Sequence, residues 1–307
     1  MKIPIWLKAI ITSVLVILIT WKIGPQRFIS NWNGANASYV LYALLFFPVV
    51  LLLGTEKWHT ISKHKVRNPG RRRFLVSFLG GMSIGLLTPA RVGEFSRVLF
   101  LEADSKVELT GIAFVDKVID LQITLMFGIW SVFIFLTKFS FVIFSLVVLL
   151  GFIFLYRPRV FMVALRPFIR ILPFEKQTAH FLTGMNSISV GVITKCLFLR
   201  TLVSIIDLFQ FYILINAFSF VSLSAVSAAY PLVILANIVP ITIGGVGIRE
   251  GVSAIVLGRF NVAPEIALSA SFVLFCINTL LPGLIGVFFV TRMKLKKNSK
   301  YQEAMMA

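Results

Sequence analysis

Charged, histidine and cysteine residues are scarce in this sequence. Only 14% of its 307 residues are charged, three are histidine and two are cysteine. The two cysteines form no CxxC motif, and no group of residues has the spacing of metal ligands. An HExxH motif, a Walker loop and the Asp-x-Asp of nucleotide-sugar transferases are also missing. We therefore expect no metal, no cofactor and no enzymatic activity, and we expect any transport to use an ion gradient or run downhill.

Apolar residues are abundant. The chain is 58% hydrophobic, with a mean hydropathy of +0.93. A helix needs about 20 apolar residues to cross a bilayer. The sequence therefore predicts an all-α, polytopic integral membrane protein with a single transmembrane domain over 1–307 and an uncleaved first span at 5–23. The expected apolar segments are 5–23, 37–54, 74–89, 109–136, 140–156, 196–218, 222–243, 248–260 and 265–291.

The net charge of +18 is large for so few charged residues. In a soluble chain it would suggest nucleic-acid binding, but here the basic residues cluster in short loops, as the positive-inside rule requires. We expect contact with membrane lipids and none with nucleic acid. We place the basic loops and both termini on the cytoplasmic side of the inner membrane. The clusters are Lys57, Lys63, Lys65, Arg67, Arg71, Arg72 and Arg73; Arg157, Arg159, Arg166, Arg170 and Lys176; and the tail 292–307.

This orientation determines the predicted topology. All three basic loops lie on one side only if 74–108 dips into the bilayer and returns, and if 222–260 enters and leaves from the opposite side. Two broken or re-entrant hairpins in inverted arrangement are typical of transporters with a site near the midplane. The alternative is two ordinary helices kinked at proline. Whether 222–260 spans fully or only halfway stays open.

The segment 157–195 is expected to lie at the cytoplasmic surface. It alternates arginines with apolar residues in an amphipathic pattern, which is typical of an interfacial helix. Pro167 and Pro173 predict that this helix is broken into two pieces.

The two broken stretches carry charge where lipid disfavours it. The first runs from Leu87 to Glu94 and the second from Val239 to Glu250. A charge at the bilayer centre costs roughly 2.5–3.5 kcal/mol on insertion scales. Non-helical backbone at that depth is tolerated only inside protein or beside a water-filled cavity. The two stretches therefore predict a polar site within the membrane.

The residue types at these tips suit an anion. A helix that restarts after Gly247 offers free N–H groups, and guanidinium groups suit phosphate oxygens. The glutamates would hold the arginines in place or bind a coupling cation or proton. The alternative is a buried Arg–Glu pair that only locks the two hairpins together. The predicted substrate-binding residues are Arg91, Glu94, Pro240, Gly245, Gly247, Arg249 and Glu250.

Further ionisable residues lie on two helices. In 109–136, Asp116 and Asp120 share one face, and Lys117 is spaced to pair with Asp120. A position at the headgroup level is an equal alternative for Asp116 and Lys117. For Asp120, one turn deeper, we favour a charge-relay or gating role. We predict the same role for Asp116 and Lys117.

The segment 196–218 carries Asp207 near its middle, with Gln210 on nearly the same stripe. A carboxylate in mid-span is a candidate functional group and needs a partner. Arg91 or Arg249 is the expected partner. We predict a charge-relay or gating role for Asp207 and Gln210 as well.

Three motifs carry a resemblance to a known family. Thr88-Pro89-Ala90-Arg91-Val92-Gly93-Glu94 resembles the Thr-Pro-Gly-Arg-x-Gly-Glu motif of flippase-like membrane proteins, the transmembrane region of lysylphosphatidylglycerol synthase and its stand-alone relatives. Pro240 to Glu250 is similar to that family's Pro-x-x-x-Gly-Gly-x-Gly-x-Arg-Glu, and Asp116 to Asp120 is similar to its Glu-Arg-x-x-Asp. Order and spacing agree over nearly the whole chain. Ala90 replaces a glycine, and Lys117 replaces an arginine that can bind in a bidentate manner.

The resemblance implies translocation of a lipid between leaflets. We expect a flippase or transporter for an anionic phospholipid or a lipid-linked glycan precursor, with an anionic headgroup or polyprenyl phosphate as the ligand. An intramembrane glycosyl- or headgroup-transferase, with Asp120 or Asp207 as general base, is the first alternative. A non-catalytic subunit of a cell-envelope synthesis complex is the second. A homo-oligomer or a partner enzyme of envelope synthesis is compatible with each.

Overall fold

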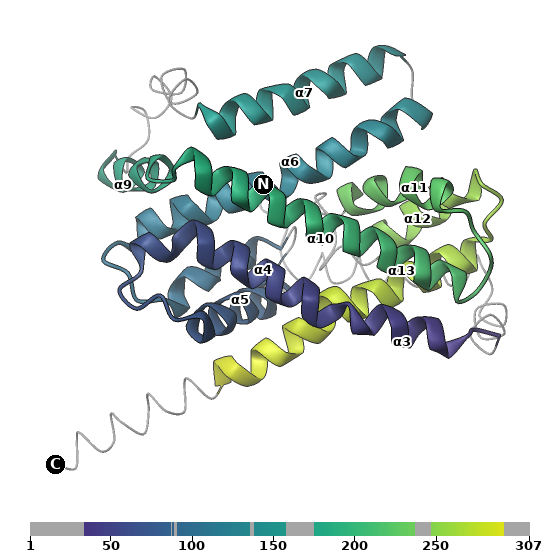
Figure 1. Ribbon diagram of the computed structural model, residues 1–307, viewed down its shortest axis with the longest axis horizontal. Helices are drawn as coiled ribbons and strands as arrows, with labels where there is room; N and C mark the ends of the chain where they lie inside the picture. Colours follow the sequence, from purple (N-terminus) through teal and green to yellow (C-terminus); the bar gives the residue numbers. More distant parts are fainter. Residues whose placement is uncertain are drawn as a thin grey trace.

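The computed structural model describes residues 34–86, 88, 91–135, 138–157, 175–236 and 247–291. Every regular element in these ranges is helical, which confirms the all-α prediction (Figure 1). The predicted first span at 5–23, Pro240, Gly245 and the tail 292–307 lie outside the described residues.

In the described part of the chain, four helices are long and apolar enough to cross a membrane, and they confirm a membrane protein with several apolar helices. They run along the long axis of the molecule (Figure 1). Two are interrupted: the first comprises α3 and α4, and the last begins with α13 and continues through the π-helical turn η4. The spans are Ala37–Lys65 with α3 (Ala37–Leu45) and α4 (Phe47–Ser62), α6 (Lys106–Phe135), α10 (Val190–Asn216), and Pro264–Thr291 with α13 (Pro264–Phe275) and η4 (Cys276–Leu280). The apolar helix α7 (Lys138–Tyr156) packs against α6.

A helical hairpin occupies one end of the molecule. Helix α5 (Arg71–Leu86) runs toward the middle, and the 3₁₀ helix η2 (Val92–Phe100) returns along it. The hairpin is tight because α5 has no side chain at Gly81, where a Cβ atom would come within 2.8 Å of the Arg97 Cβ and 2.9 Å of the Glu94 carbonyl oxygen. The Ser77 hydroxyl also donates to the Arg97 carbonyl oxygen at 2.8 Å. These contacts fix the position of η2, which carries two charged residues of the site.

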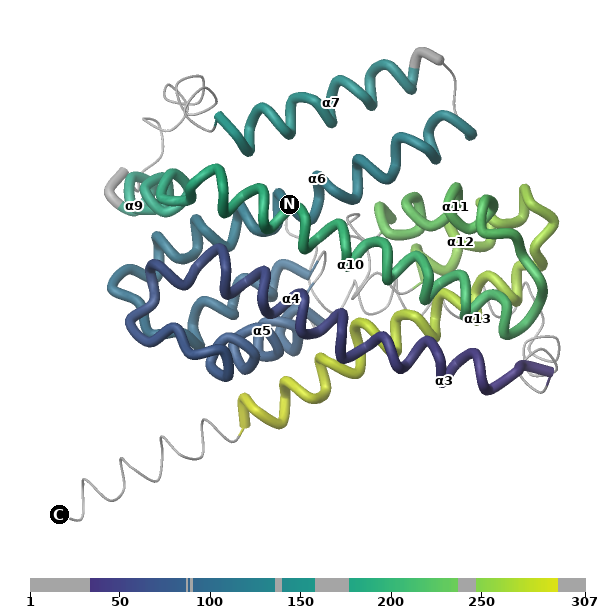
Figure 2. The backbone as a smooth tube through the Cα atoms, viewed as in Figure 1, coloured from purple at the N-terminus to yellow at the C-terminus, as the bar shows by residue number. Residues whose placement is uncertain are grey.

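A second pair of short helices packs together at the opposite end. Helix α11 (Leu223–Leu235) runs inward and α12 (Ile248–Gly258) runs back outward, packed on α11 and α13. In the tube view, α5 lies in the left half of the molecule, while α11 and α12 lie in the right half (Figure 2). The two hairpins therefore approach the middle of the molecule from opposite ends.

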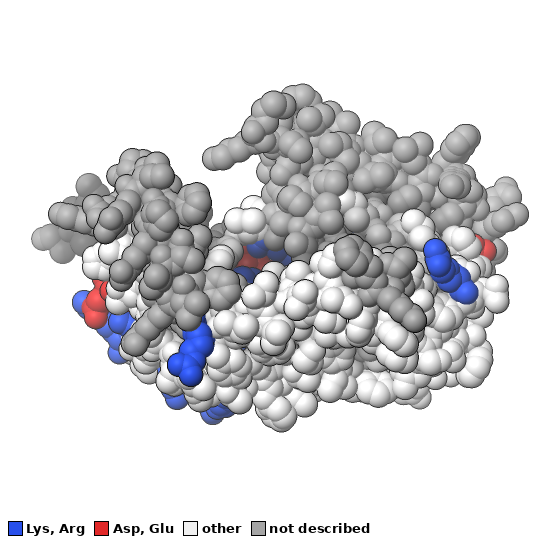
Figure 3. Space-filling view, turned by 90° about the horizontal axis from the view of Figure 1, so that it is seen from above, with Lys and Arg blue, Asp and Glu red and all other residues white. Residues whose placement is uncertain are grey.

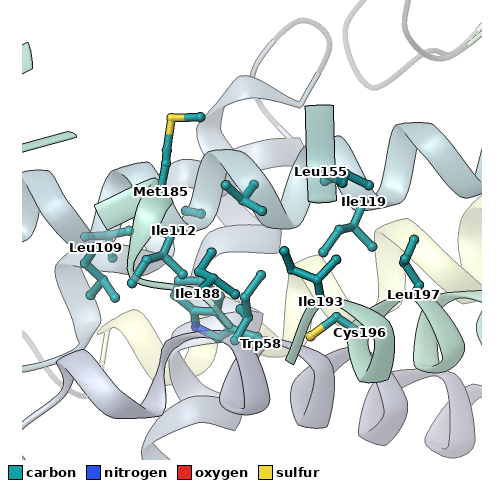
Figure 4. Close-up of a cluster of buried hydrophobic side chains, with 14 of the residues drawn as sticks. Trp58, Leu109, Ile112, Ile119, Leu155, Met185, Ile188, Ile193, Cys196 and Leu197 are labelled. Atoms are coloured by element: carbon teal, nitrogen blue, oxygen red, sulfur yellow. The ribbon is translucent and has the colours of Figure 1, made fainter. Parts of the chain in front are cut away.

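Two apolar clusters hold this arrangement together. The first surrounds Trp58 and joins α4 and α6 to α10 and to the helix α9 (Glu175–Asn186) (Figure 4). The second surrounds Phe211 and joins α10 to α11 and α13. Of the predicted surface segment 157–195, the structure describes residue 157 and residues 175–195, which comprise α9, packed on α6, and the beginning of the long helix α10. The predicted break at Pro167 and Pro173 lies outside the described residues.

Candidate functional site

A pocket of about 410 Å³ lies in the middle of the molecule, where the two hairpins meet. Side chains of both hairpins and of the long helices α4, α6, α10 and α13 line it. In the space-filling view, charged side chains are visible at the bottom of a recess in an otherwise uncharged part of the surface (Figure 3). The charged lining comprises the basic residues Lys57, Arg91, Arg97, Lys117, Arg200 and Arg249 and the acidic residues Glu94, Asp120 and Asp207.

The same pocket has an apolar wall. It is built by helix α4, by the hairpin of α5 and η2, and by the end of α13. The pocket is therefore amphipathic: one part offers charges and hydrogen-bond donors, and the other offers aliphatic and aromatic surface. The apolar lining includes Phe47, Val50, Leu51, Phe78, Met82, Phe95, Leu274 and Phe275.

The first tip places Glu94 between two basic groups. Arg91 adopts a left-handed backbone conformation, with φ 55°, directly before η2 begins. Its Nε lies 2.5 Å from Glu94 Oε1, and the Lys117 ammonium binds Glu94 Oε2 from α6. The Gly93 N–H donates to the Thr88 hydroxyl at 2.7 Å and closes the turn. A strained non-glycine residue at such a tip is typical of functional sites.

Helix α6 presents two carboxylates, one turn apart, to the basic residues. Asp116 is fully buried; its Oδ2 lies 2.6 Å from Arg97 Nη2, and its Oδ1 lies 3.1 Å from Lys57 Nζ. Asp120 faces the pocket and contacts Lys57, Lys117 at 3.5 Å and Arg200 at 3.3 Å. Both carboxylates thus lie within the bundle and join α6 to η2, α4 and α10.

The mid-span carboxylate Asp207 has a different partner from the one expected. Its Oδ2 lies 3.8 Å from Nη1 of Arg200 on the same helix, and its Oδ1 accepts a hydrogen bond from Asn278 at 3.0 Å. The buried Gln210 bonds Asn278 and donates to the Ala43 carbonyl oxygen at 2.9 Å. The expected pairing of Asp207 with Arg91 or Arg249 is therefore replaced by a pairing within α10.

At the second tip, a carboxylate of α12 itself occupies the N-terminus of that helix. Gly247 has a φ of 90°, which disfavours any other residue, and its N–H donates to Glu250 Oε2 at 2.7 Å. The other carboxylate oxygen of Glu250 binds the guanidinium group of Arg249. Arg249 also donates to the Ser271 hydroxyl at 3.1 Å, and its guanidinium lies 4.9 Å from the ring centre of Phe275. The carboxylate at this N-terminus is thus Glu250 itself.

Three basic residues of the pocket are absent from the predicted site. Lys57 was assigned to a cytoplasmic loop, but it lies inside α4 with 4% of its surface exposed, because Asp116 and Asp120 neutralise it there. Arg97 is 2% exposed and lies 4.0 Å from the ring centre of Trp58. Arg200 carried a sequence signal, because it recurs with Asp207 on one stripe of an apolar helix.

The described ranges support neither a metal site nor a hydrolase nucleophile. These ranges contain no cluster of three His, Cys, Asp or Glu residues that could hold a metal ion. The stretch Gly81-Met82-Ser83-Ile84-Gly85 matches the GxSxG pattern of hydrolases. Ser83, however, lies inside helix α5, and its hydroxyl contacts the carbonyl oxygens of Leu79 at 3.0 Å and Gly283 at 2.8 Å. It is a structural residue and not an exposed nucleophile.

Comparison with known proteins agrees with the resemblance that the three sequence motifs carry. Residues 5–286 match the family described as the lysylphosphatidylglycerol synthase TM region. The chain belongs to this family. It is 22% identical over 324 residues to the UPF0104 membrane protein MJ1595 of Methanocaldococcus jannaschii, covering 95% of each chain. It is 29% identical over 123 residues to the UPF0104 membrane protein PH1989 of Pyrococcus horikoshii, covering 38% of this chain and 36% of that one. No solved structure matches it.

In this member of the lysylphosphatidylglycerol synthase TM region family, the three motif segments come together in space. Arg91 and Glu94 of the first motif, Lys117 and Asp120 of the second, and Arg249 of the third all line one pocket. Segments that are far apart in the sequence therefore contribute to a single charged site.

Proposed function

We propose that this protein is a lipid flippase, which moves an anionic phospholipid or a lipid-linked glycan precursor between leaflets. The observation that carries the proposal is the amphipathic pocket, where six basic and three acidic side chains lie beside an apolar wall. Arginine and lysine suit phosphate oxygens, and the apolar wall suits a hydrocarbon chain. Membership in a family described by a phospholipid synthase's membrane region supports a lipid as the ligand.

We also propose that the two hairpins are re-entrant in the cytoplasmic membrane. The basic residues Lys63, Lys65, Arg67 and Arg71 cluster at the end where α5 begins, so the positive-inside rule favours a cytoplasmic position for this end. Arg91 and Arg249 reach one pocket from opposite ends of the molecule. Broken helices that meet at a site near the midplane are typical of transporters that work by alternating access.

A transport assay in vesicles tests the proposal. The purified full-length protein is reconstituted with a trace of fluorescent phosphatidylglycerol, and an impermeant quencher reports how fast inner-leaflet lipid reaches the outer leaflet. We expect the wild type to exceed protein-free vesicles. Arg91→Gln should slow transport by about tenfold or more, because a charge-assisted contact to the phosphate is lost.

Arg67→Gln is the matched control. It is the same substitution, but the Arg67 side chain is 71% exposed and pairs with Asp104 at the surface, so transport should be unchanged. Equal rates for the wild type and Arg91→Gln would contradict the proposal. A new covalent product formed with nucleotide-sugar donors would indicate the transferase alternative. Co-purification with a partner enzyme, without transport by this chain alone, would indicate an accessory subunit.

A further inference from the structure

Within the described ranges, the charged groups at the pocket form a set that can be counted. Six are basic, and all six belong to the lining. Five are acidic: the three of the lining, together with Asp116 and Glu250, which bind Arg97 and Arg249. At neutral pH this set therefore carries one net positive charge. Residues 87, 89–90 and 237–246 lie outside the described ranges, and none of them is charged.

The surplus charge belongs to one part of the set. Arg249 with Glu250 forms a pair in which both residues are buried, each with 4% of its surface exposed. The remaining basic and acidic groups form a network in which five cations share four carboxylates. These cations are Lys57, Arg91, Arg97, Lys117 and Arg200, and the carboxylates are Glu94, Asp116, Asp120 and Asp207.

Exposure indicates where a ligand meets this network. The side chains of Arg91 and Lys117 are each 32% exposed, whereas those of Lys57 and Arg200 are 6% and 18% exposed. Arg91 and Lys117 bind different oxygens of Glu94. A ligand anion beside Glu94 therefore meets the two most accessible cations at once.

We infer that the pocket binds a headgroup with one net negative charge, a phosphodiester monoanion held against Arg91 and Lys117. The inference rests on the proposed function for the lipid that carries this headgroup. A zwitterionic headgroup would leave the surplus positive charge uncompensated. A phosphomonoester dianion or a diphosphate would add a negative charge that has no partner. Both imbalances are unfavourable in a partly buried site, so headgroup charge sets the affinity.

Binding of short-chain lipids tests the inference without requiring transport. The protein in detergent is titrated at pH 8 with dioctanoyl phosphatidylglycerol, phosphatidylcholine and phosphatidic acid, and thermal unfolding reports each Kd. This pH is above the second pKa of a phosphomonoester, so the phosphatidic acid headgroup is mostly dianionic. We expect the Kd for phosphatidylglycerol to be at least about tenfold lower than the Kd values for phosphatidylcholine and phosphatidic acid.

Two variants shift the charge of the network by one unit in opposite directions. Glu94→Gln raises it and should move the preference toward phosphatidic acid. Lys117→Gln lowers it and should move the preference toward phosphatidylcholine, while Arg67→Gln at the surface should leave the wild-type order. Equal affinities of the three lipids for the wild type would overturn the inference, whether or not the variants fold. An unchanged order in both folded variants would overturn it as well.

The outcomes separate this inference from the proposed function. Selective binding of phosphatidylglycerol without transport in vesicles would refute the flippase and support the inference. Transport of all three lipids at equal rates, with equal affinities, would support the flippase and overturn the inference.

Discussion

Replacing Asp116 with asparagine should destabilise the protein strongly. Asp116 is fully buried and is the counter-ion of two cations, at 2.6 Å from Arg97 and 3.1 Å from Lys57. Removing one partner of a buried ion pair costs about 3–5 kcal/mol, because an uncompensated charge stays behind. Here Arg97 loses the carboxylate that it binds and Lys57 keeps only Asp120, so we expect a cost of about this size.

Thermal unfolding of the purified protein in detergent measures this cost as a fall in Tm. Large domains change by about 2–4 °C per kcal/mol, so Asp116→Asn should lower Tm by roughly 6–20 °C. The matched control is Asp104→Asn, because Asp104 lies 2.5 Å from Arg67 but its side chain is 78% exposed. An exposed pair contributes about 0–1 kcal/mol, so the control should shift Tm by less than about 4 °C.

A second substitution tests the physical cause. Adding Lys57→Met to Asp116→Asn removes one of the two cations that lost Asp116, while Asp120 keeps Lys117 and Arg200, so the double variant should recover part of the lost Tm. The reasoning would be refuted if Asp116→Asn unfolded at the same temperature as Asp104→Asn. It would also be refuted if the double variant were no more stable than the single one.

Two further predictions concern the elements that position the site. Gly81→Ala should lower Tm, because the added Cβ would lie 2.8 Å from the Cβ of Arg97 and force the first hairpin apart, a change that costs about 1–3 kcal/mol. Asn278→Ala should lower Tm as well. Gln210 loses a hydrogen bond of 2.8 Å and Asp207 loses one of 3.0 Å. Leaving such buried groups unsatisfied costs about 1–3 kcal/mol.

Each of these predictions has a matched control. Gly191→Ala places a Cβ where no heavy atom lies within 4 Å, so its Tm should equal or exceed that of the wild type. Asn68→Ala removes an exposed asparagine and should leave Tm unchanged. If Gly81→Ala behaved like Gly191→Ala, the close approach of η2 to α5 would be disproved. If Asn278→Ala behaved like Asn68→Ala, the amide bridge between α10 and η4 would contribute nothing to stability.

The sequence by itself determined the class of the protein and most of its helices. Apolar runs of sufficient length predict membrane helices, because the bilayer sets the length that each helix needs. The predicted segments 109–136, 140–156 and 265–291 match Lys106–Phe135, Lys138–Tyr156 and Pro264–Thr291 closely. The motifs at Arg91 and Arg249 also indicated the family, which the comparison with known proteins confirms.

The tertiary structure alone decided which charges face one another. Lys57 looked like a loop residue because the apolar run ends before it, yet the helix continues to Ser62, where carboxylates of α6 neutralise the lysine. Arg97 gave no signal in the sequence and is among the most deeply buried charges of the site. A charge is stable inside a bundle only beside its counter-ion. For Lys57 and Arg97 that counter-ion lies on another helix, so helix packing, which no local pattern encodes, determines whether these charges are buried.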